Sequence, residues 1–350
     1  MSDAMPISYA ALALQISCKA INDCTSRELA HSEMLASIER ISRQIRASKA
    51  FIGQHLKLVV LPEYFLSGFP MGESITGWAE KAAIDMDGEI YSALSSAAQN
   101  NSVYLSGNVY EKDKHFPDLY FQTSFILDPQ GDIILRYRRL ISMFAPTPHD
   151  VMDKYLDIYG PDSLFPVAKT PLGNLACVAS EEILYPEISR ALALRGAEII
   201  CHSSSEIGSP QLTPKNIAKL ARAYENHVFV ISANSAGIAN IDIPEFSTDG
   251  GSKIIDFHAH ILAEAAAGES MVANADIDIS ALRHHRQRAS MFNVLSRQRL
   301  ELFRNTYSQT IYPANTLLDE QKNCLVPSRN HFLDTQRDVI AAMQKRGIIQ

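Results

Sequence analysis

Residues 170–187 read TPLGNLACVASEEILYPE, a stretch that predicts a strand running into a helix with a polar side chain at the turn. Because strand side chains alternate between two faces, Cys177 and Ser180 point to opposite sides of this strand. Cys177 lies in mid-strand, where a free cysteine is usually a small buried hydrophobe. Ser180 lies at the strand end, ahead of a helix that opens near Pro186. Ser180 is therefore in position to be presented as a nucleophile.

Strands and helices alternate on both sides of this stretch, which indicates an α/β fold. Strands are predicted at 8–16, 56–61, 103–110, 119–139 (as two strands around a turn), 175–180, 197–202, 227–233, 252–265 and 270–277. Helices are predicted after a capping box at Thr25 and Glu28, and at 87–100, 186–195, 212–226 and 334–346. Parallel strand–helix units mixed with antiparallel hairpins favour an α/β sandwich. The simplest organisation is a single domain over residues 1–305, followed by a C-terminal extension over residues 306–350.

Composition excludes several classes of protein. The 350 residues are 46% hydrophobic, and the formal net charge of -7 is scattered without a clustered basic face, which excludes a nucleic-acid binder. The N-terminal stretch lacks a basic region ahead of an apolar run, and no stretch of roughly 20 apolar residues predicts a membrane span. We therefore expect a cytoplasmic protein. Five cysteines at irregular spacing argue against a disulfide framework.

No metal or cofactor site is predicted. The sequence has no CxxC pair, no HExxH motif and no Gly-rich phosphate loop. His258 and His260 alternate on a predicted strand, and His284 and His285 lie among arginines, but neither pair has a third ligand at suitable spacing. We interpret both pairs as solvated polar faces.

Two further stretches carry candidate catalytic side chains. In VVLPEYF (59–65), Glu63 follows a buried strand, where α/β proteins often place active groups. In LRYRRL (135–140), we interpret Arg136 and Arg138 as a solvated hairpin arm and Arg139 as a cation with a buried partner. A loop of about thirty residues then runs from 140 to 169, and loops of that length are usually functional.

In this order and at these separations, the three stretches resemble the nitrilase (carbon–nitrogen hydrolase) superfamily. Glu63 matches the catalytic Glu of the family's PE motif, and Arg139 stands where the family's YRK motif has its Lys. The family's Cys ends a strand that begins TP-x-G and is followed six residues on by PE, and both anchors place Ser180 at that position. The segments RALALRGAEII (190–200), ARAYENHVFVISANSAG (221–237) and SKIIDFHAHILAEA (252–265) extend the resemblance, which covers roughly residues 8–290.

The resemblance implies a four-layer α-β-β-α sandwich and a small-molecule ligand, without a metal or an organic cofactor. In the family, Glu acts as a general base, Lys stabilises the oxyanion, and a Cys thiolate attacks an amide or nitrile carbon. Family members pair through helices that flank the nucleophile segment. The resemblance therefore implies a homodimer or higher homo-oligomer, with the extension 306–350 at the oligomer interface.

The departures from the family pattern change the expected chemistry. A carboxylate can deprotonate a thiol, but an alcohol is more basic and serine hydrolases normally use a His or Lys for that step. Arg139 keeps the positive charge but cannot shuttle a proton. The family also has a second Glu between its Lys and Cys, whereas no Glu occurs here between Glu111 and Glu181. The acidic residues of the long loop before Gly160 are Asp150, Asp153 and Asp157, so at best an Asp substitutes for it.

Two functions stay open. In the first, Glu63, Arg139 and Ser180 act on a small amide, nitrile or N-carbamoyl compound without the usual Cys acyl-enzyme. Its substrate contacts are then predicted from four residues: Tyr64, Asp150, Glu181 and His202. Cys201 is disfavoured as a relocated nucleophile, because most buried cysteines are inert.

In the second, the chain is a catalytically inactive pseudoenzyme that binds a small ligand or a partner subunit, and Glu63 and Arg139 form a buried ion pair. An engineered Cys→Ser change would explain Ser180 but not Arg139. Because random decay would more often leave apolar residues in a buried site, the charges kept at Glu63 and Arg139 favour the modified enzyme.

Overall fold

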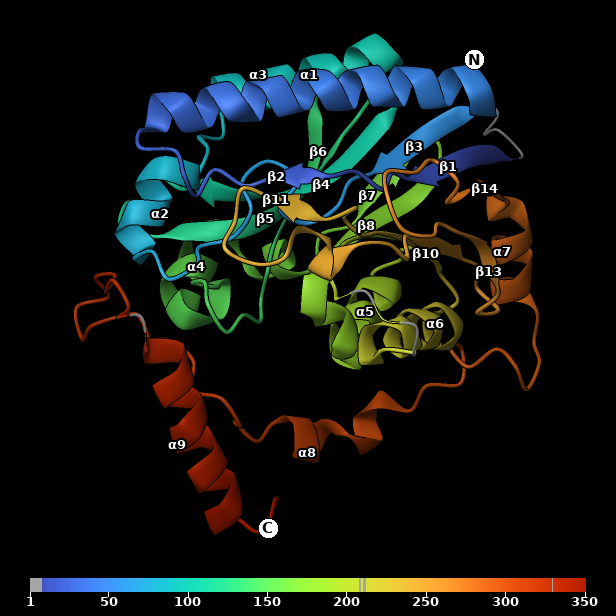
Figure 1. The fold of residues 1–350 in the computed structure, drawn as a ribbon. Coiled ribbons are helices and arrows are strands. Elements are labelled where there is room, and N and C mark those ends of the chain that lie inside the picture. Colours follow the sequence, from blue (N-terminus) through green and yellow to red (C-terminus); the bar gives the residue numbers. More distant parts are fainter. Residues whose placement is uncertain (1–7, 208, 210–211, 329) are drawn as a thin grey trace.

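Two six-stranded sheets lie face to face in this computed structural model, and helices cover the outer face of each sheet (Figure 1). The structure describes residues 8–207, 209, 212–328 and 330–350. The covering helices are α1 (Arg27–Ile52) and α3 (Glu89–Asn101) on one side, and α5 (Pro186–Leu194) and α6 (Pro214–Asn226) on the other. The predicted four-layer α-β-β-α sandwich is therefore confirmed.

The first sheet has the strand order β14–β1–β3–β4–β5–β6. Its strands are β14 (Asn274–Ile277), β1 (Tyr9–Ala13), β3 (Leu56–Val60), β4 (Tyr104–Lys112), β5 (Tyr120–Leu127) and β6 (Ile133–Arg138). The central strands β1, β3 and β4 run parallel, whereas β14, β5 and β6 join antiparallel. The antiparallel β5–β6 hairpin is the one predicted around residues 128–131.

The second sheet has the order β13–β12–β10–β9–β8–β7. Its strands are β13 (Ile261–Glu264), β12 (Lys253–Ile255), β10 (Phe229–Ala233), β9 (Ile199–Ser203), β8 (Gly173–Ala179) and β7 (Ala168–Thr170). Here β8, β9 and β10 run parallel and the outer strands antiparallel. A small parallel pair, β2 (Cys18–Lys19) with β11 (Ile238–Ala239), lies outside both sheets.

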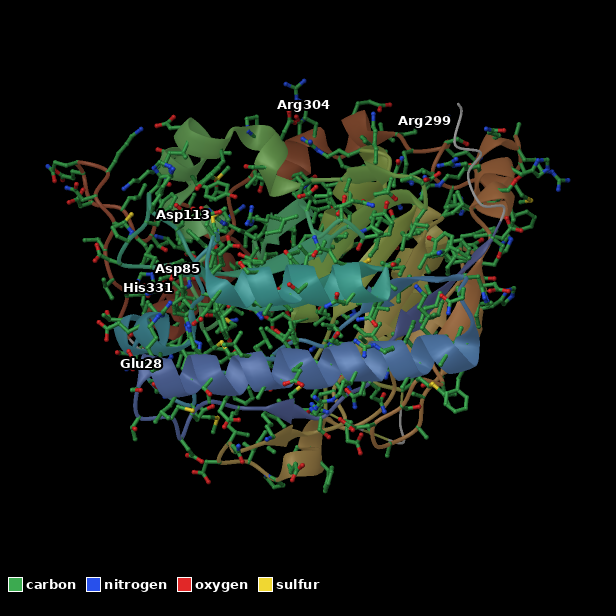
Figure 2. The ribbon with its side chains drawn as sticks, turned by 90° about the horizontal axis from the view of Figure 1, so that it is seen from above. Glu28, Asp85, Asp113, Arg299, Arg304 and His331 are labelled. Atoms are coloured by element: carbon green, nitrogen blue, oxygen red, sulfur yellow. The ribbon has the colours of Figure 1, made fainter. Side chains whose placement is uncertain are left out.

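The remaining helices are short or peripheral. They are α2 (Ile75–Ala82), α4 (Met152–Tyr159), α7 (Ile279–Gln287), α8 (Arg304–Tyr307), α9 (His331–Lys345) and the 3-10 turns η1 (Pro148–Val151), η2 (Pro161–Leu164), η3 (Ser180–Leu184), η4 (Glu245–Thr248) and η5 (Leu300–Leu302). Seen from above, α1 and α3 lie side by side across the first sheet (Figure 2). No helix in the described ranges is both long and apolar enough to cross a membrane.

Alternation along the central strands fills two separate cores. In β3, Leu58 and Val60 point into the space between the sheets, whereas Val59 points toward α1 and α3. All three side chains are completely buried, as the run of apolar residues predicts for a parallel strand covered on both faces.

The TP-x-G start of the opening stretch is the β7–β8 hairpin. Thr170 pairs with Gly173 across the turn, and the Thr170 hydroxyl donates to the Gly173 carbonyl at 2.7 Å. Gly173 has a φ of +117°, and a Cβ there would lie 3.1 Å from the Glu198 carboxylate. Both facts favour glycine, so this turn fixes where β8 begins and hence where Ser180 emerges.

Two local predictions were wrong. The cap of α1 is Ser26, whose hydroxyl accepts from the Leu29 amide at 3.3 Å, and the predicted capping box one residue earlier does not form. The stretch 140–169 is no structureless loop, because it contains η1, α4 and η2. Its helical turns start at a capping box between Thr147 and Asp150, a signal that the length of the loop obscured.

After α7 the chain runs past α5 and α6 and ends in α9 (Figure 1). The Tyr307 hydroxyl donates to Glu187 of α5 at 2.9 Å, and Phe332 of α9 is buried. The division at residue 305 stays a prediction. The predicted absence of a leader concerns in part residues 1–7, which lie outside the described residues.

Candidate active site

The ends of strands from the two sheets bring Glu63 and Ser180 to the same end of the sandwich. Ser180 follows directly after Ala179, which pairs with Ser203 in the neighbouring strand β9. The next residue of that strand end, Ser204, accepts a hydrogen bond at 3.2 Å from the Glu63 amide, just past β3. This single backbone hydrogen bond therefore links the segment that carries Glu63 to the end of β9, the strand beside Ser180.

Ser180 has a backbone conformation that is rare for residues other than glycine. Its φ is +48°, and Tyr64, next to Glu63, has a φ of +63°. Non-glycine residues in this region carry strain, and such residues cluster at active sites. The strain at Ser180 turns the chain sharply from β8 into η3 and leaves its side chain at the strand end.

His202 holds the Ser180 turn from behind. Its Nε2 lies 2.8 Å from the Ser180 carbonyl and its Nδ1 lies 2.9 Å from the Ser232 hydroxyl. Burial, followed by the charge of Lys219, lowers the pKa of His202 well below its usual value, so the ring is neutral. A carbonyl only accepts, hence Nε2 carries the proton. We predicted a substrate contact for His202, but the structure buries it completely beneath the turn, so that role stays a prediction.

Arg139 joins the carboxylates of two predicted site residues. Its Nη1 lies 3.5 Å from Glu63 Oε1, and its Nη2 donates to Glu181. Gln122 supports both partners, because Arg139 donates to its Oε1 at 2.6 Å and its Nε2 donates to Glu63 at 2.7 Å. Burial is the strongest single effect and lowers the pKa of Arg139, but the nearby acidic groups, led by the Glu63 carboxylate, together outweigh it. The net pKa is raised, so Arg139 stays charged.

The rim of this cluster is half-exposed, whereas its centre is buried. Glu63 is 0% exposed and Arg139 is 6% exposed. Tyr64 and Glu181 are half-buried beside them. Burial and then the Glu63 carboxylate raise the pKa of Tyr64 well above its usual value, so Tyr64 is a neutral phenol. A ligand reaching the cluster therefore meets a phenol and a carboxylate before the buried ion pair.

Glu182 is a site residue that sequence reasoning missed. Its Oε1 accepts from the amides of Leu140 and Ile141 at 2.7 and 3.1 Å, and its Oε2 accepts from the Tyr137 hydroxyl at 2.8 Å. Burial raises its pKa to about 7, against the opposing charge of Arg139. Glu182 thus connects residues 140–141, which follow Arg139, to the turn that begins at Ser180. Its position two residues after Ser180 was the available signal.

Lys215 is a second residue that the sequence did not single out. It lies in the first turn of α6, after the N-cap Thr213, and its Nζ lies 3.4 Å from Ser180 Oγ. Lys215 is half-buried, as expected for an ammonium at the edge of a site. No motif marks it, because its contact joins segments 35 residues apart.

Asp150 is not brought to this cluster. Its Oδ2 accepts from the Thr147 amide and hydroxyl at 2.9 and 2.7 Å, and its Oδ1 accepts from the Thr316 hydroxyl at 2.9 Å. Both carboxylate oxygens are thus engaged in capping η1 and in holding the C-terminal extension. The carboxylate that pairs with Arg139 from the second sheet's side is that of Glu181.

The expectation that Arg138 is solvated was wrong. Its side chain is buried, and its Nη2 lies 2.5 Å from Asp113 and 3.4 Å from Glu111. Arg136 is partly exposed and pairs with the same Glu111 at 3.2 Å. The alternation of basic residues suggested a solvated arm because the acidic partners lie in and after β4, out of sequence range.

The cysteines and histidines do not provide an alternative site. Burial raises the pKa of Cys177 to about 12 and that of Cys201 well above its usual value, which is typical of inert buried thiols. Across the described part of the chain, no group of three or more His, Cys, Asp or Glu side chains is arranged to hold a metal ion.

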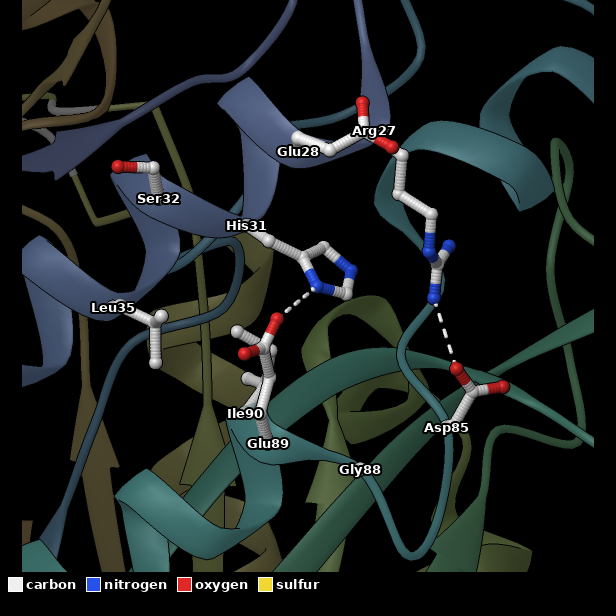
Figure 3. A pocket seen from close by; sticks show the side chains of 9 residues that line it. All are labelled: Arg27, Glu28, His31, Ser32, Leu35, Asp85, Gly88, Glu89 and Ile90. Carbon is white, nitrogen blue, oxygen red and sulfur yellow. Dashed lines mark hydrogen bonds and ion pairs between the residues drawn. The ribbon is translucent and has the colours of Figure 1, made fainter.

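A separate cavity of about 590 Å³ lies between the starts of α1 and α3 (Figure 3). Its charged groups pair with one another, Arg27 with Asp85 at 3.0 Å and His31 with Glu89 at 2.8 Å. None of the predicted site residues lines it. The chemistry-bearing cluster and this cavity are therefore different places.

Comparison with known proteins finds that the chain is similar to proteins named amidases and nitrilases. A sequence model of the family described as Carbon-nitrogen hydrolase matches residues 19–287. Omega-amidase NIT2 of Danio rerio is 24% identical over 250 residues, which is 71% of this chain and 86% of that protein. The 2-oxoglutaramate amidase of Bacillus subtilis (strain 168) is 27% identical over 267 residues, which is 72% of this chain and 91% of that protein.

Solved structures share the fold. The carbon-nitrogen hydrolase from Helicobacter pylori G27 superposes with a TM-score of 0.65 at 19% identity, covering 87% of this chain and 100% of that one. Nit3 of Saccharomyces cerevisiae, a member of branch 10 of the nitrilase superfamily, superposes with a TM-score of 0.63 at 20% identity, covering 82% and 96%.

Proposed function

The chain belongs to the carbon-nitrogen hydrolase family, and from that premise we propose that it hydrolyses the C–N bond of a small amide-type compound. The proposed site uses Glu63, Arg139 and Ser180 in place of the usual cysteine mechanism. The observation that carries the proposal is the buried Arg139, which joins Glu63 to Glu181, the residue next to Ser180.

Retention of this cluster favours a working site. Burying charged groups carries a desolvation cost, and well-packed apolar residues are often neutral or stabilising in their place. Glu63 and Arg139 nevertheless remain charged and buried beside a strained hydroxyl-bearing residue. This arrangement supplies an acid–base group, a cation for a developing oxyanion and a nucleophilic oxygen.

The expected substrate is small and carries an amide, nitrile or N-carbamoyl group. Relatives are named formamidase and 2-oxoglutaramate amidase, which are amidase names attached to small substrates. We propose that Tyr64 and Glu181, half-buried at the rim, make the first contacts with such a substrate. Glu181 supplies the second carboxylate beside Arg139 that the sequence lacks between Glu111 and Glu181.

A catalytically inactive binding protein is the second candidate. One observation favours it: both outer nitrogens of Arg139 already bind protein groups, Gln122 and Glu181. In this function, the ion pair of Arg139 stabilises the pocket and takes no part in a reaction. In that function the same rim residues bind a ligand, or the site holds a partner subunit, without turnover.

Ammonia release from a panel of small amides, nitriles and N-carbamoyl compounds separates the two functions. Wild type is compared with Ser180→Ala and Ser180→Cys, and with Ser92→Ala on the exposed face of α3 as a matched control. Turnover that is lost in Ser180→Ala and kept in Ser92→Ala supports the modified hydrolase. Activity gained only in Ser180→Cys, or absence of turnover from all variants, supports the binding protein.

Association of chains through the α5–α6 side, cytoplasmic location and a role of residues 306–350 at an oligomer interface stay predictions. Exposed apolar side chains on this side are consistent with pairing: Leu184, Tyr185, Leu194, Ile217 and Tyr224. Light scattering coupled to size exclusion would give the mass of the assembly, and a monomer would contradict the prediction.

A further inference from the structure

Lys215 is the charged group at the site that the family pattern leaves without a role. Its Nζ lies 3.4 Å from Ser180 Oγ, the atom that would attack the substrate. We propose that Lys215 is the base that takes the proton of the Ser180 hydroxyl, so that the two residues form a nucleophile–base pair. This inference rests on the proposed hydrolase function and names the group that makes a serine usable in it.

Arg139, His202 and Glu63 make no described contact with the Ser180 hydroxyl. Arg139 cannot give up a proton readily, and it is held by Glu63 and Glu181. His202 directs its Nε2 proton at the Ser180 carbonyl instead of the hydroxyl. Glu63 Oε1 accepts from Gln122 and faces Arg139. Among the described residues, Lys215 is the basic group recorded in contact with the Ser180 hydroxyl.

The surroundings of Lys215 leave its amine in contact with the Ser180 hydroxyl. Lys219, one helical turn further along α6, is completely buried and pairs with Glu206. Among the described residues, no carboxylate forms an ion pair with Lys215, so its amine is not drawn away from Ser180 Oγ.

The proposed step balances as an ordinary acyl transfer. Ser180 Oγ attacks the carbonyl carbon of the amide while its proton passes to the neutral amine of Lys215, and the carbonyl π electrons move to oxygen. Collapse of this intermediate breaks the C–N bond, and the Lys215 ammonium protonates the departing nitrogen, which leaves as ammonia. Water then hydrolyses the ester, which releases the carboxylate and returns the proton to Ser180 Oγ.

Labelling with a fluorophosphonate tests the pair without knowledge of the substrate. The rate of Ser180 modification is followed by intact mass and peptide mapping in wild type, Lys215→Met and Lys215→Arg. Ser180→Ala is the negative control and Lys322→Met, on the exposed surface, the matched lysine control. We expect the rate to fall about 100-fold or more in both Lys215 variants, the size typical of a lost general base.

Lys215→Met and Lys215→Arg together distinguish the loss of a base from the loss of a positive charge. Arg keeps the positive charge but cannot accept the proton, so a Lys215→Arg variant that labels like wild type would overturn the base role. A small primary amine should restore labelling of Lys215→Ala, which shows that the loss is chemical and that the variant is folded.

Replacing the nucleophile gives an internal check. A thiol is more acidic than an alcohol and needs a weaker base. Lys215→Met should therefore lower the labelling rate of the Ser180→Cys variant much less than it lowers the labelling rate of wild type. Equal losses in both backgrounds would mean that Lys215 only shapes the pocket. Ammonia release that persists unchanged in Lys215→Met would overturn this inference alone, whereas wild type that neither labels at Ser180 nor releases ammonia would overturn the proposed function with it.

Discussion

Arg139 Nη1 lies 3.5 Å from Glu63 Oε1, and both side chains are buried where strands of the two sheets end. The same guanidinium donates to Glu181 through its other outer nitrogen. A planar fork can bind two carboxylates in fixed directions, whereas a lysine ammonium is a compact point charge. In the proposed site, where Arg139 takes the place of the family's Lys, the carboxylate of Glu181 supplies the second partner for the fork.

Substituting Arg139 by Gln should destabilise the protein strongly. Removal of the cation leaves Glu63 buried without its partner, and breaking a buried pair in this way costs about 3–5 kcal/mol in free energy of unfolding. Arg139→Lys should cost less, because it keeps the charge and loses only part of the fork. Urea unfolding measures both variants.

The control for this prediction is Arg195→Gln, because Arg195 forms an exposed pair with Asp162 at 2.9 Å. Exposed pairs of this kind contribute about 0–1 kcal/mol. If Arg139→Gln unfolded at the same urea concentration as this control, Glu63 would not depend on Arg139 for its burial.

The Glu182 network should behave as a unit. Glu182→Gln retains an oxygen for the Leu140 and Ile141 amides, but its new amide group cannot accept from the Tyr137 hydroxyl. We expect a loss of about 1–3 kcal/mol in free energy of unfolding, the range for an unsatisfied buried polar group.

A double-mutant cycle with Tyr137→Phe checks this prediction. Tyr137 donates to Glu182 at 2.8 Å, so the two substitutions should cost clearly less together than the sum of their separate costs. Strict additivity in urea unfolding would show that the hydroxyl and the carboxylate are energetically independent.

Sequence reasoning identified the fold and the strand-end residues because both depend on short-range signals. Alternation and apolar runs mark strands such as β3, and the TP-x-G start and the PE sequence bracket Ser180 on both sides. It failed where a side chain's environment is set by distant partners. Arg138 looked solvated because Asp113, which buries its charge, is 25 residues away, and Lys215 reaches Ser180 only through the packing of α6.

Arg138 should affect stability without affecting the site chemistry. It pairs with Asp113 and Glu111, and its guanidinium lies 4.7 Å from the Phe121 ring centre. Arg138→Met would leave two buried carboxylates without this cation, so we expect a loss of about 3–5 kcal/mol in free energy of unfolding. The rate of Ser180 labelling per folded molecule should stay within about twofold of wild type.

Arg136→Met is the matched comparison for Arg138. Arg136 pairs with the same Glu111 at 3.2 Å, but its own side chain is 28% exposed, and Glu111 keeps its contact with Arg138 when Arg136 is removed. We expect a loss of about 1 kcal/mol in free energy of unfolding for this variant. An equal cost for the two variants would mean that burial does not distinguish these arginines.

His227 should make the protein sensitive to acid. The residue is completely buried at the C-terminal end of α6, and its ring centre lies 4.6 Å from that of His285. Burial, then His285 and then Arg286 lower the pKa of His227 to about 4. An unfolded histidine titrates near 6.5, so between about pH 6.5 and 4 the unfolded chain binds a proton that the folded chain does not. The contribution of neutral His227 to the free energy of unfolding is therefore complete above pH 6.5 and falls as the pH drops toward 4.

Replacing His227 by Asn tests this linkage. Asn tolerates the left-handed conformation that His227 adopts, at φ +47°, and does not titrate in this range. We expect the loss of unfolding free energy between pH 7 and pH 4.5 to be smaller in His227→Asn than in wild type, by up to about 3 kcal/mol. His260→Asn, at an exposed position beside Asp256, is the control and should keep the wild-type slope. Parallel pH profiles for wild type and His227→Asn would show that another group causes the acid sensitivity, with His285, whose pKa burial also lowers, as the next to test.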